Sequence, residues 1–179
     1  MATTTTKLMT FAEFERIPNP PGFRYELHHG ELVTVPFPQF PDVGAQWQLR
    51  RLLESAAGSA GVVHTEMPYR PLPEHECWGA DIVYIAKTRW EGIDRYVMGA
   101  PDLVVEVLSP SNSASEMLDK RNVCLDNGSR EFWVVDTDHR QVEVSTTDGH
   151  TITYKSGQEI PLVFGGHLAV DSIFAPAEG

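Results

Sequence analysis

The sequence predicts a mixed α/β fold in which helices flank a mixed central sheet and the chain ends in an antiparallel β meander. One observation is the segment 101–111, where apolar residues occupy both faces of a strand bounded by Pro101 and Pro110, as in a strand buried inside a sheet. Another is a capped helix followed by a second strand of this kind at 131–136. A third is the alternation of apolar and polar residues beyond Arg140, which is typical of antiparallel strands at a sheet edge.

Capping and turn residues indicate the elements that precede the central strand. Thr10 and Glu13 form a capping box at the start of a short helix. His29-Gly30 lies between two alternating segments, which predicts a β-hairpin. The predicted elements are a helix at 11–17, hairpin strands at 23–28 and 31–35, a helix at 43–57, strands at 62–69 and 80–86, and a connection at 87–100 with a helical turn at 89–93.

Two longer helices have recognisable buried faces. In the first, the apolar side chains expected to face the sheet are those of Val43, Trp47, Leu53 and Ala57. The second begins with a capping box formed by Ser113 and Glu116 and ends at Gly128. Its apolar stripe consists of Met117, Val123, Cys124 and Leu125. Because strand–helix–strand units close with a right-handed crossover, the strand at 131–136 is expected to lie parallel to the central strand.

Length and composition indicate one domain. The 179 residues suffice to bury a real core, and we expect a flexible tail at 1–9 and a single domain at 10–179. With 41% hydrophobic and 22% charged residues, the composition argues against disorder, and no apolar run is long enough to span a membrane. The two cysteines, Cys77 and Cys124, form neither a disulfide framework nor a zinc pattern. We therefore expect a cytoplasmic protein.

The charge of the chain restricts its partners. The formal net charge is −11, from 25 acidic and 14 basic residues. Such a chain lacks the general basic surface that most nucleic-acid-binding proteins use. It remains compatible with a nucleic-acid enzyme that binds divalent metal ions in an acidic cleft.

Glu106 is the unusual residue of the central strand. An ionised carboxylate in an apolar strand is costly unless a cation or hydrogen-bond donors face it. Asp81 lies near the start of the preceding strand, and the two carboxylates stand side by side if the strands are antiparallel neighbours. Lys120 lies on the apolar stripe of the following helix, three residues after Met117 and four before Cys124. Two carboxylates with a lysine suit a divalent cation and phosphodiester hydrolysis.

The same residues also have a purely structural interpretation. Asp81 can cap a turn, and Glu106 and Lys120 can form a buried ion pair that serves only the fold. From spacing alone, this interpretation has the same weight as the functional one. The adjacent His28 and His29 point in opposite directions and are expected to be solvated.

Several stretches of the chain match the pattern of one known family. The most distinctive is the segment 99–111 together with Lys120. The others are 11–15, 25–27 with 30–33, Gly128 with 131–136, and the closing Ile173-Phe174. Together they resemble the Uma2 family, bacterial restriction-endonuclease-like proteins within the PD-(D/E)XK nuclease superfamily. The resemblance covers nearly the whole chain and implies a restriction-endonuclease-like fold.

The resemblance implies roles for particular residues. Asp81 stands at the family's first metal-binding aspartate, Glu106 at its second carboxylate, and Glu26 at a further acid near the site. The superfamily lysine commonly follows the second acid by two residues, where this chain has Leu108, so the family pattern points to Lys120 on the next helix. The implied metal ligands are Asp81, Glu106 and Glu26, the implied catalytic residues are Asp81, Glu106 and Lys120, and the implied cofactor is Mg²⁺ (or Mn²⁺).

These features leave more than one function open. The first hypothesis is a metal-dependent endonuclease acting on DNA, in which Lys120 orients the attacking water. The second is a catalytically silent nuclease-fold protein that acts as an oligomeric binding or regulatory module, and the third is a hydrolase of smaller phosphate esters. We also expect a homodimer without membrane association, because the edge strands after Arg140 need covering and Val163 and Phe164 are expected to be exposed.

Overall fold

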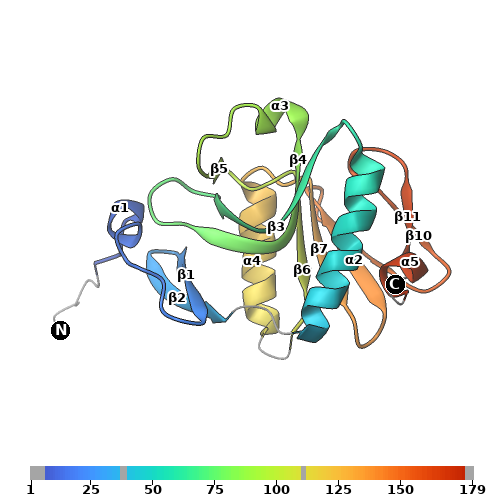
Figure 1. Ribbon diagram of the computed structural model, residues 1–179, viewed down its shortest axis with the longest axis horizontal. Coiled ribbons are helices and arrows are strands. Elements are labelled where there is room, and N and C mark those ends of the chain that lie inside the picture. Colours follow the sequence, from blue (N-terminus) through green and yellow to red (C-terminus); the bar gives the residue numbers. More distant parts are fainter. Residues whose placement is uncertain (1–6, 37–39, 110–111, 176–179) are drawn as a thin grey trace.

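A seven-stranded mixed sheet forms the centre of the computed structural model, which describes residues 7–36, 40–109 and 112–175 (Figure 1). Its strand order is β5-β3-β4-β6-β7-β8-β9. These strands are β3 (Gly61–Arg70), β4 (Trp78–Ala86), β5 (Val97–Met98), β6 (Leu103–Val107), β7 (Glu131–Asp136), β8 (Gln141–Thr146) and β9 (Thr151–Tyr154). Strand β6 lies in the middle of this order and all of its residues are buried, which confirms the predicted central strand.

The strand directions make the sheet mixed, as predicted. Strand β6 is antiparallel to β4 and parallel to β7, and helix α4 (Ala114–Asp126) connects it to β7. The capping box of α4 is present, because Ser113 accepts a hydrogen bond from the Glu116 backbone and Glu116 accepts one from the Ser113 backbone. Strands β8 and β9 form the predicted antiparallel meander, and β9 is the edge of the sheet.

Helices cover both faces of the sheet. Helix α2 (Phe40–Ala57) packs through Leu49 and Leu53 against the face of β6 that carries Leu103 and Val105. Helix α4 packs through Cys124 against the opposite face, in the cluster that contains Val104 of β6. The two faces of β6 predicted from its sequence are therefore both buried, each beneath a different helix.

The buried face of α2 differs from the prediction. Val43 and Trp47, predicted to face the sheet, have 41% and 44% of their surface exposed. The buried stripe contains Leu49, Leu53 and Ala57, which are spaced by four residues and lie on the side of the helix away from Trp47. The Trp47 ring instead stacks in solvent beneath the guanidinium of Arg51, 4.6 Å from the ring centroid.

A hairpin separate from the main sheet precedes α2. Helix α1 (Phe11–Phe14) has its predicted capping box at Thr10, and β1 (Phe23–His28) pairs with β2 (Glu31–Pro36) around His29-Gly30 as predicted. Leu27 of β1 exchanges two 2.8 Å backbone hydrogen bonds with Cys77, which attaches the hairpin to the start of β4. Residues 7–9, within the expected tail, also contact this region, since the Met9 N–H donates to the Gly30 carbonyl at 2.9 Å.

The helical turn predicted at 89–93 is present as α3, two residues earlier, at Lys87–Trp90. Small elements that were not predicted complete the fold, namely β5, β10 (Glu159–Pro161), β11 (His167–Ala169) and α5 (Val170–Ile173). The expectation that Val163 and Phe164 are exposed is wrong, because both are partly buried against the core. The Phe164 ring lies 4.5 Å from that of Tyr84, so the β10–β11 segment folds back over the sheet. None of the helices in the described part of the chain has the length and apolarity needed to cross a bilayer.

Leu53→Ala tests the packing of α2. Leu53 is fully buried between α2 and the sheet, so this truncation is expected to lower the free energy of unfolding by about 2–5 kcal/mol. Leu118→Ala on α4 is the matched control, because Leu118 is 47% exposed and the same chemical change there is expected to cost within about 0.5 kcal/mol. Urea denaturation of both variants measures the difference, and equal losses would contradict the assigned core.

Candidate metal-binding and catalytic site

The two predicted carboxylates lie next to each other in the sheet. Ile82 of β4 pairs with Val105 of β6, and one further step in this register places Asp81 opposite Glu106. Directly opposed residues of antiparallel strands project to the same face. Asp81 Oδ2 accepts a hydrogen bond from the backbone N–H of Val107 at 2.7 Å, so the aspartate side chain lies along β6.

The strand on the other side of Asp81 is distorted. Strand β3 pairs with β4 at Thr65–Ile82 and at Met67–Ala80, and Glu66 lies between these pairs, opposite Asp81. Glu66 has a φ of +53°, which is uncommon for a residue other than glycine and typical of strained functional sites. The pairing of β3 with β4 is thus interrupted opposite Asp81, which lies within β4.

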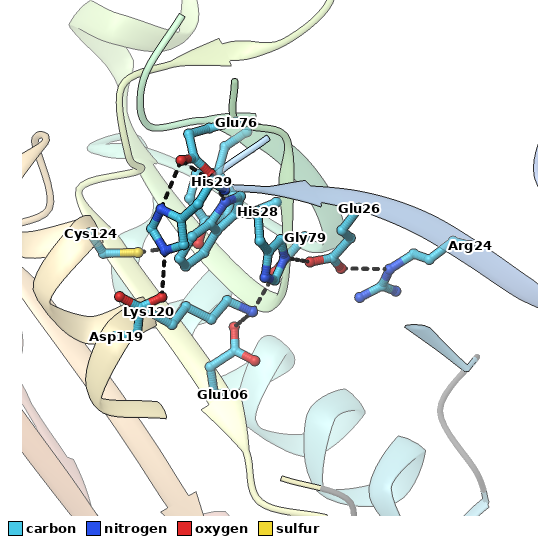
Figure 2. Close-up of polar contacts among 12 residues, drawn as sticks. Arg24, Glu26, His28, His29, Glu76, Gly79, Glu106, Asp119, Lys120 and Cys124 are labelled. Carbon is cyan, nitrogen blue, oxygen red and sulfur yellow. Dashed lines mark hydrogen bonds and ion pairs between the residues drawn. The ribbon is translucent and has the colours of Figure 1, made fainter. Parts of the chain in front are cut away.

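Lys120 extends from α4 to the carboxylates. Its Nζ lies 2.7 Å from Glu106 Oε1 and donates a 2.6 Å hydrogen bond to the carbonyl oxygen of Gly79 (Figure 2). The side chains of Lys120 and Glu106 are about 10% exposed. The prediction that Lys120 lies on the stripe of α4 facing the sheet is therefore confirmed, and its partner is the acid inside the central strand.

Glu26 approaches the same place from the hairpin. It is buried on β1, where Oε1 accepts from Arg24 Nε at 3.0 Å and Oε2 lies 2.7 Å from His28 Nε2 (Figure 2). A Cβ atom on Gly79 would come within 2.8 Å of Glu26 Oε1 and 3.0 Å of Arg24 Nη2. The hairpin thus lies directly on the backbone of β4, and glycine is needed at position 79 for this approach.

A second group of contacts ties the hairpin to β4 and α4. His29 Nε2 lies 2.7 Å from Asp119 Oδ2, and the His29 backbone N–H donates to both carboxylate oxygens of Glu76 (Figure 2). The His28 ring stacks on Trp78 at 4.3 Å. The expectation that both histidines are solvated is wrong for His28, whose ring is half-buried against Trp78, and is confirmed for His29, whose side chain is 53% exposed although it contacts Asp119 and Glu76.

Burial and mutual repulsion set the charge state of the central acids. Burial raises the pKa of Asp81, although the Val107 N–H and Lys120 oppose the rise. Burial, reinforced by the negative charges of Asp81 and Glu26, raises the pKa of Glu106 to about 8 despite the stabilising effect of Lys120. For both acids, the positive charge nearby is too small to offset the cost of ionising a buried carboxyl group.

For Glu26 and Lys120, neighbouring groups outweigh burial and favour the charged form of each side chain. Burial by itself would raise the pKa of Glu26, but its bond to His28 and the charges of Lys120 and Arg24 lower it to about 2. Burial alone would lower the pKa of Lys120, but Glu106 and Glu26 outweigh it and raise the pKa above its usual range. Lys120 therefore carries its proton throughout the neutral range.

The donor set fits a hard divalent cation. Mg²⁺ typically takes one or two protein carboxylates and completes its shell with water and substrate oxygens, and Asp81 with Glu106 provides such a pair. In the described part of the chain no three His, Cys, Asp or Glu side chains are grouped to hold a metal, and Glu26 is engaged by Arg24 and His28. Ion pairs join Glu106 to Lys120 and join Glu26 and Glu66 to Arg24, and the charges of Lys120 and Arg24 also act on Asp81.

Three residues of this cluster were not identified from the sequence. Arg24 and His28 alternate with Glu26 along β1, and this two-residue period is the signal that places all three on one face. Nothing in the local sequence indicates the positive φ of Glu66. The need for glycine at position 79 arises from the hairpin packing, which is a tertiary contact.

Comparisons with known proteins agree with this architecture. A family model named Uma2 and described as "Putative restriction endonuclease" matches residues 11–167. A protein from Anabaena variabilis, whose crystal structure is described as that of "a putative nuclease belonging to DUF820", is similar over 93% of this chain and 97% of its own, with 22% sequence identity and a TM-score of 0.82. No curated protein matches the chain. Since the family model spans the sheet, the hairpin and α4, the chain belongs to the Uma2 family.

Proposed function

We propose that the protein is a divalent-metal-dependent endonuclease that hydrolyses phosphodiester bonds of DNA. The observation that carries the proposal is the arrangement of Asp81 and Glu106 side by side on neighbouring strands, with the Lys120 ammonium 2.7 Å from Glu106. The description of the Uma2 family and the description of the Anabaena protein as a nuclease support the same activity.

Asp81 and Glu106 are the proposed metal ligands. Both are acids with a raised pKa in a cluster short of positive charge, and cation binding would stabilise their ionised forms. A bound Mg²⁺ or Mn²⁺ supplies positive charge that stabilises the negative charge developing on the phosphoryl oxygens. Glu26 is proposed to assist through its negative charge, which holds the Lys120 ammonium and the Arg24 guanidinium near the site.

Lys120 is proposed to act through its charge. In hydrolysis, a water oxygen attacks phosphorus while the bond to the leaving ester oxygen breaks; the water releases a proton to solvent, the leaving oxygen takes one from solvent, and negative charge increases on the phosphate in between. Because Glu106 and Glu26 keep Lys120 protonated, the lysine is a hydrogen-bond donor that orients the water or a phosphoryl oxygen. It is not a base that removes the proton of the water.

Homodimerisation and a cytoplasmic location are also part of the proposal. Strand β9 is the edge of the main sheet, and its Ile152 is 53% exposed, which supports pairing with a second copy. Cys77 and Cys124 are free and buried, as suits a reducing compartment.

Metal binding is testable by thermal denaturation. Mg²⁺ or Mn²⁺ in excess is expected to raise the melting temperature of the parent protein by about 3–6 °C, because the ion binds only the folded state. Asp81→Asn and Glu106→Gln are expected to fold and to lose this shift, whereas Asp126→Asn, on the exposed end of α4, keeps it. A full shift in Asp81→Asn would contradict the ligand assignment, and no shift in any protein would favour the catalytically silent module.

Cleavage of labelled DNA tests the role of Lys120. Lys120→Met is expected to lower kcat by about 10²-fold, because a hydrogen-bond donor to the transition state is lost, while the thermal shift with metal is retained. Lys120→Arg keeps the charge and is expected to recover part of the rate. Wild-type cleavage by Lys120→Met would show that the lysine serves only the fold, and cleavage by Asp81→Asn at the parent rate would refute the site.

Light scattering at micromolar concentration tests the dimer. The parent protein is expected to scatter with twice the chain mass, and Ile152→Lys is expected to give a monomer because it places a charge on the unpaired edge. Leu118→Lys, at an exposed leucine of α4, is the control and is expected to stay dimeric. A monomeric parent would overturn this part of the proposal.

A further inference from the structure

A pocket opens beside the candidate site, between α1, the β1–β2 hairpin, β3 and β4. Its volume is about 320 Å³. Glu26 and Gly79 are among its lining residues, and both also belong to the candidate site, where the Gly79 carbonyl accepts the hydrogen bond from Lys120. A ligand in this pocket therefore lies next to the proposed metal ligands.

We propose that this pocket binds a single unpaired nucleotide of the substrate strand, next to the phosphodiester that is cleaved. The inference rests on the proposed nuclease function and specifies its substrate class, which is DNA with unpaired nucleotides at the cleavage position. The pocket contains the three kinds of group that a nucleotide requires, namely cations for phosphate, aromatic rings for the base, and acceptors for base amino groups.

Two arginines in the pocket wall provide the cations. Arg24 pairs with Glu26 and with Glu66, and its side chain is 19% exposed. Arg95 has 67% of its side chain exposed, lies with its guanidinium 5.3 Å from the Tyr96 ring, and contacts Glu15 at 2.6 Å. Guanidinium groups bind phosphate oxygens in a two-point geometry, so Arg95 at the rim is suited to contact the phosphate of an entering nucleotide.

Aromatic and acidic side chains line the rest of the pocket. Tyr25 and Tyr96 are partly exposed and lie in its wall, where they are suited to stack on a base. Glu66, the residue with the positive φ, lines the pocket with 31% of its side chain exposed, and its carboxylate is an acceptor for a base amino group. Every DNA base except thymine carries an amino group.

The charge of the chain favours an unpaired nucleotide over a duplex surface. Binding of duplex DNA depends on many lysine and arginine contacts to phosphates, and this chain has a net charge of −11. The pocket wall holds Arg24 and Arg95 beside Glu15, Glu26 and Glu66, a set suited to contacts with one nucleotide and not with a long run of phosphates. A nucleotide that is already unpaired enters such a pocket without the cost of unstacking a duplex.

Binding of labelled DNA in the absence of metal tests the pocket separately from cleavage. Asp81→Asn and the parent protein, both in EDTA, are titrated against a blunt duplex, the same duplex with a single-stranded overhang, and the single strand, by fluorescence anisotropy. The overhang and the single strand are expected to bind about tenfold more tightly than the blunt duplex. Equal affinity for all three DNAs in both proteins would overturn the proposal.

Arg95→Ala identifies the pocket as the source of the preference. It is expected to reduce the preference for the overhang by about five- to tenfold, because a phosphate contact and the support of Tyr96 are lost. Arg51→Ala is the matched control, since Arg51 is also an exposed arginine stacked on an aromatic ring, on α2 and outside the pocket wall. An equal loss in both variants would show a general charge effect and overturn the assignment.

The two proposals fail in different ways. Suppose that the parent protein with Mg²⁺ or Mn²⁺ cleaves blunt and overhanging DNA at the same rate and shows no binding preference. This result would refute the nucleotide pocket and support the nuclease proposal. Suppose instead that no DNA is cleaved, but the overhang is preferred and Arg95→Ala loses this preference. This result would support nucleotide binding in the pocket and refute the nuclease proposal.

Discussion

The contact between Lys120 and Glu106 is the interaction on which the rest of the site depends. A carboxylate in the middle of a buried strand is tolerated only when compensating charge reaches it, and the ammonium at 2.7 Å comes from the helix that connects β6 to β7. The right-handed crossover fixes which face of the sheet this helix covers. Helix α4, which connects β6 to β7, therefore also places Lys120 beside Glu106.

The β1–β2 hairpin adds further charged side chains next to the buried pair of Lys120 and Glu106. It contributes Glu26 and Arg24, contacts β4 through the backbone of Leu27 and Cys77, and packs closely on Gly79. Its side chains meet the start of β4 through the close approach of Glu26 and Arg24 to Gly79 and the stacking of His28 on Trp78. The pocket lies between α1, the hairpin and this end of the sheet, so the contact that brings Glu26 to the site also forms part of the pocket wall.

The parts of the fold that were predictable from sequence have local causes. The capping boxes at Thr10 and Ser113 and the two-faced apolar pattern of β6 are determined by neighbouring residues, and the structure contains all of them. The burial of Trp47 was mispredicted because an apolar residue in a helix does not reveal which side meets the sheet. Likewise, the adjacency of Asp81 and Glu106 followed from strand order, whereas the position of Glu66 depends on a strained φ that no sequence pattern indicates.

The charge balance of the cluster explains why an acidic protein is a plausible enzyme for a polyanion. Asp81, Glu106, Glu26 and Glu66 bring four negative charges when ionised, and Lys120 and Arg24 bring two positive ones. The difference equals the charge of one divalent cation. Burial, with a smaller effect of the Asp81 and Glu26 charges, raises the pKa of Glu106 to about 8, and a bound cation would favour its ionised form. A metal ion held by Asp81 and Glu106 would offset part of this negative charge and the repulsion of an incoming phosphate, so the proposed activity is compatible with a cluster rich in carboxylates.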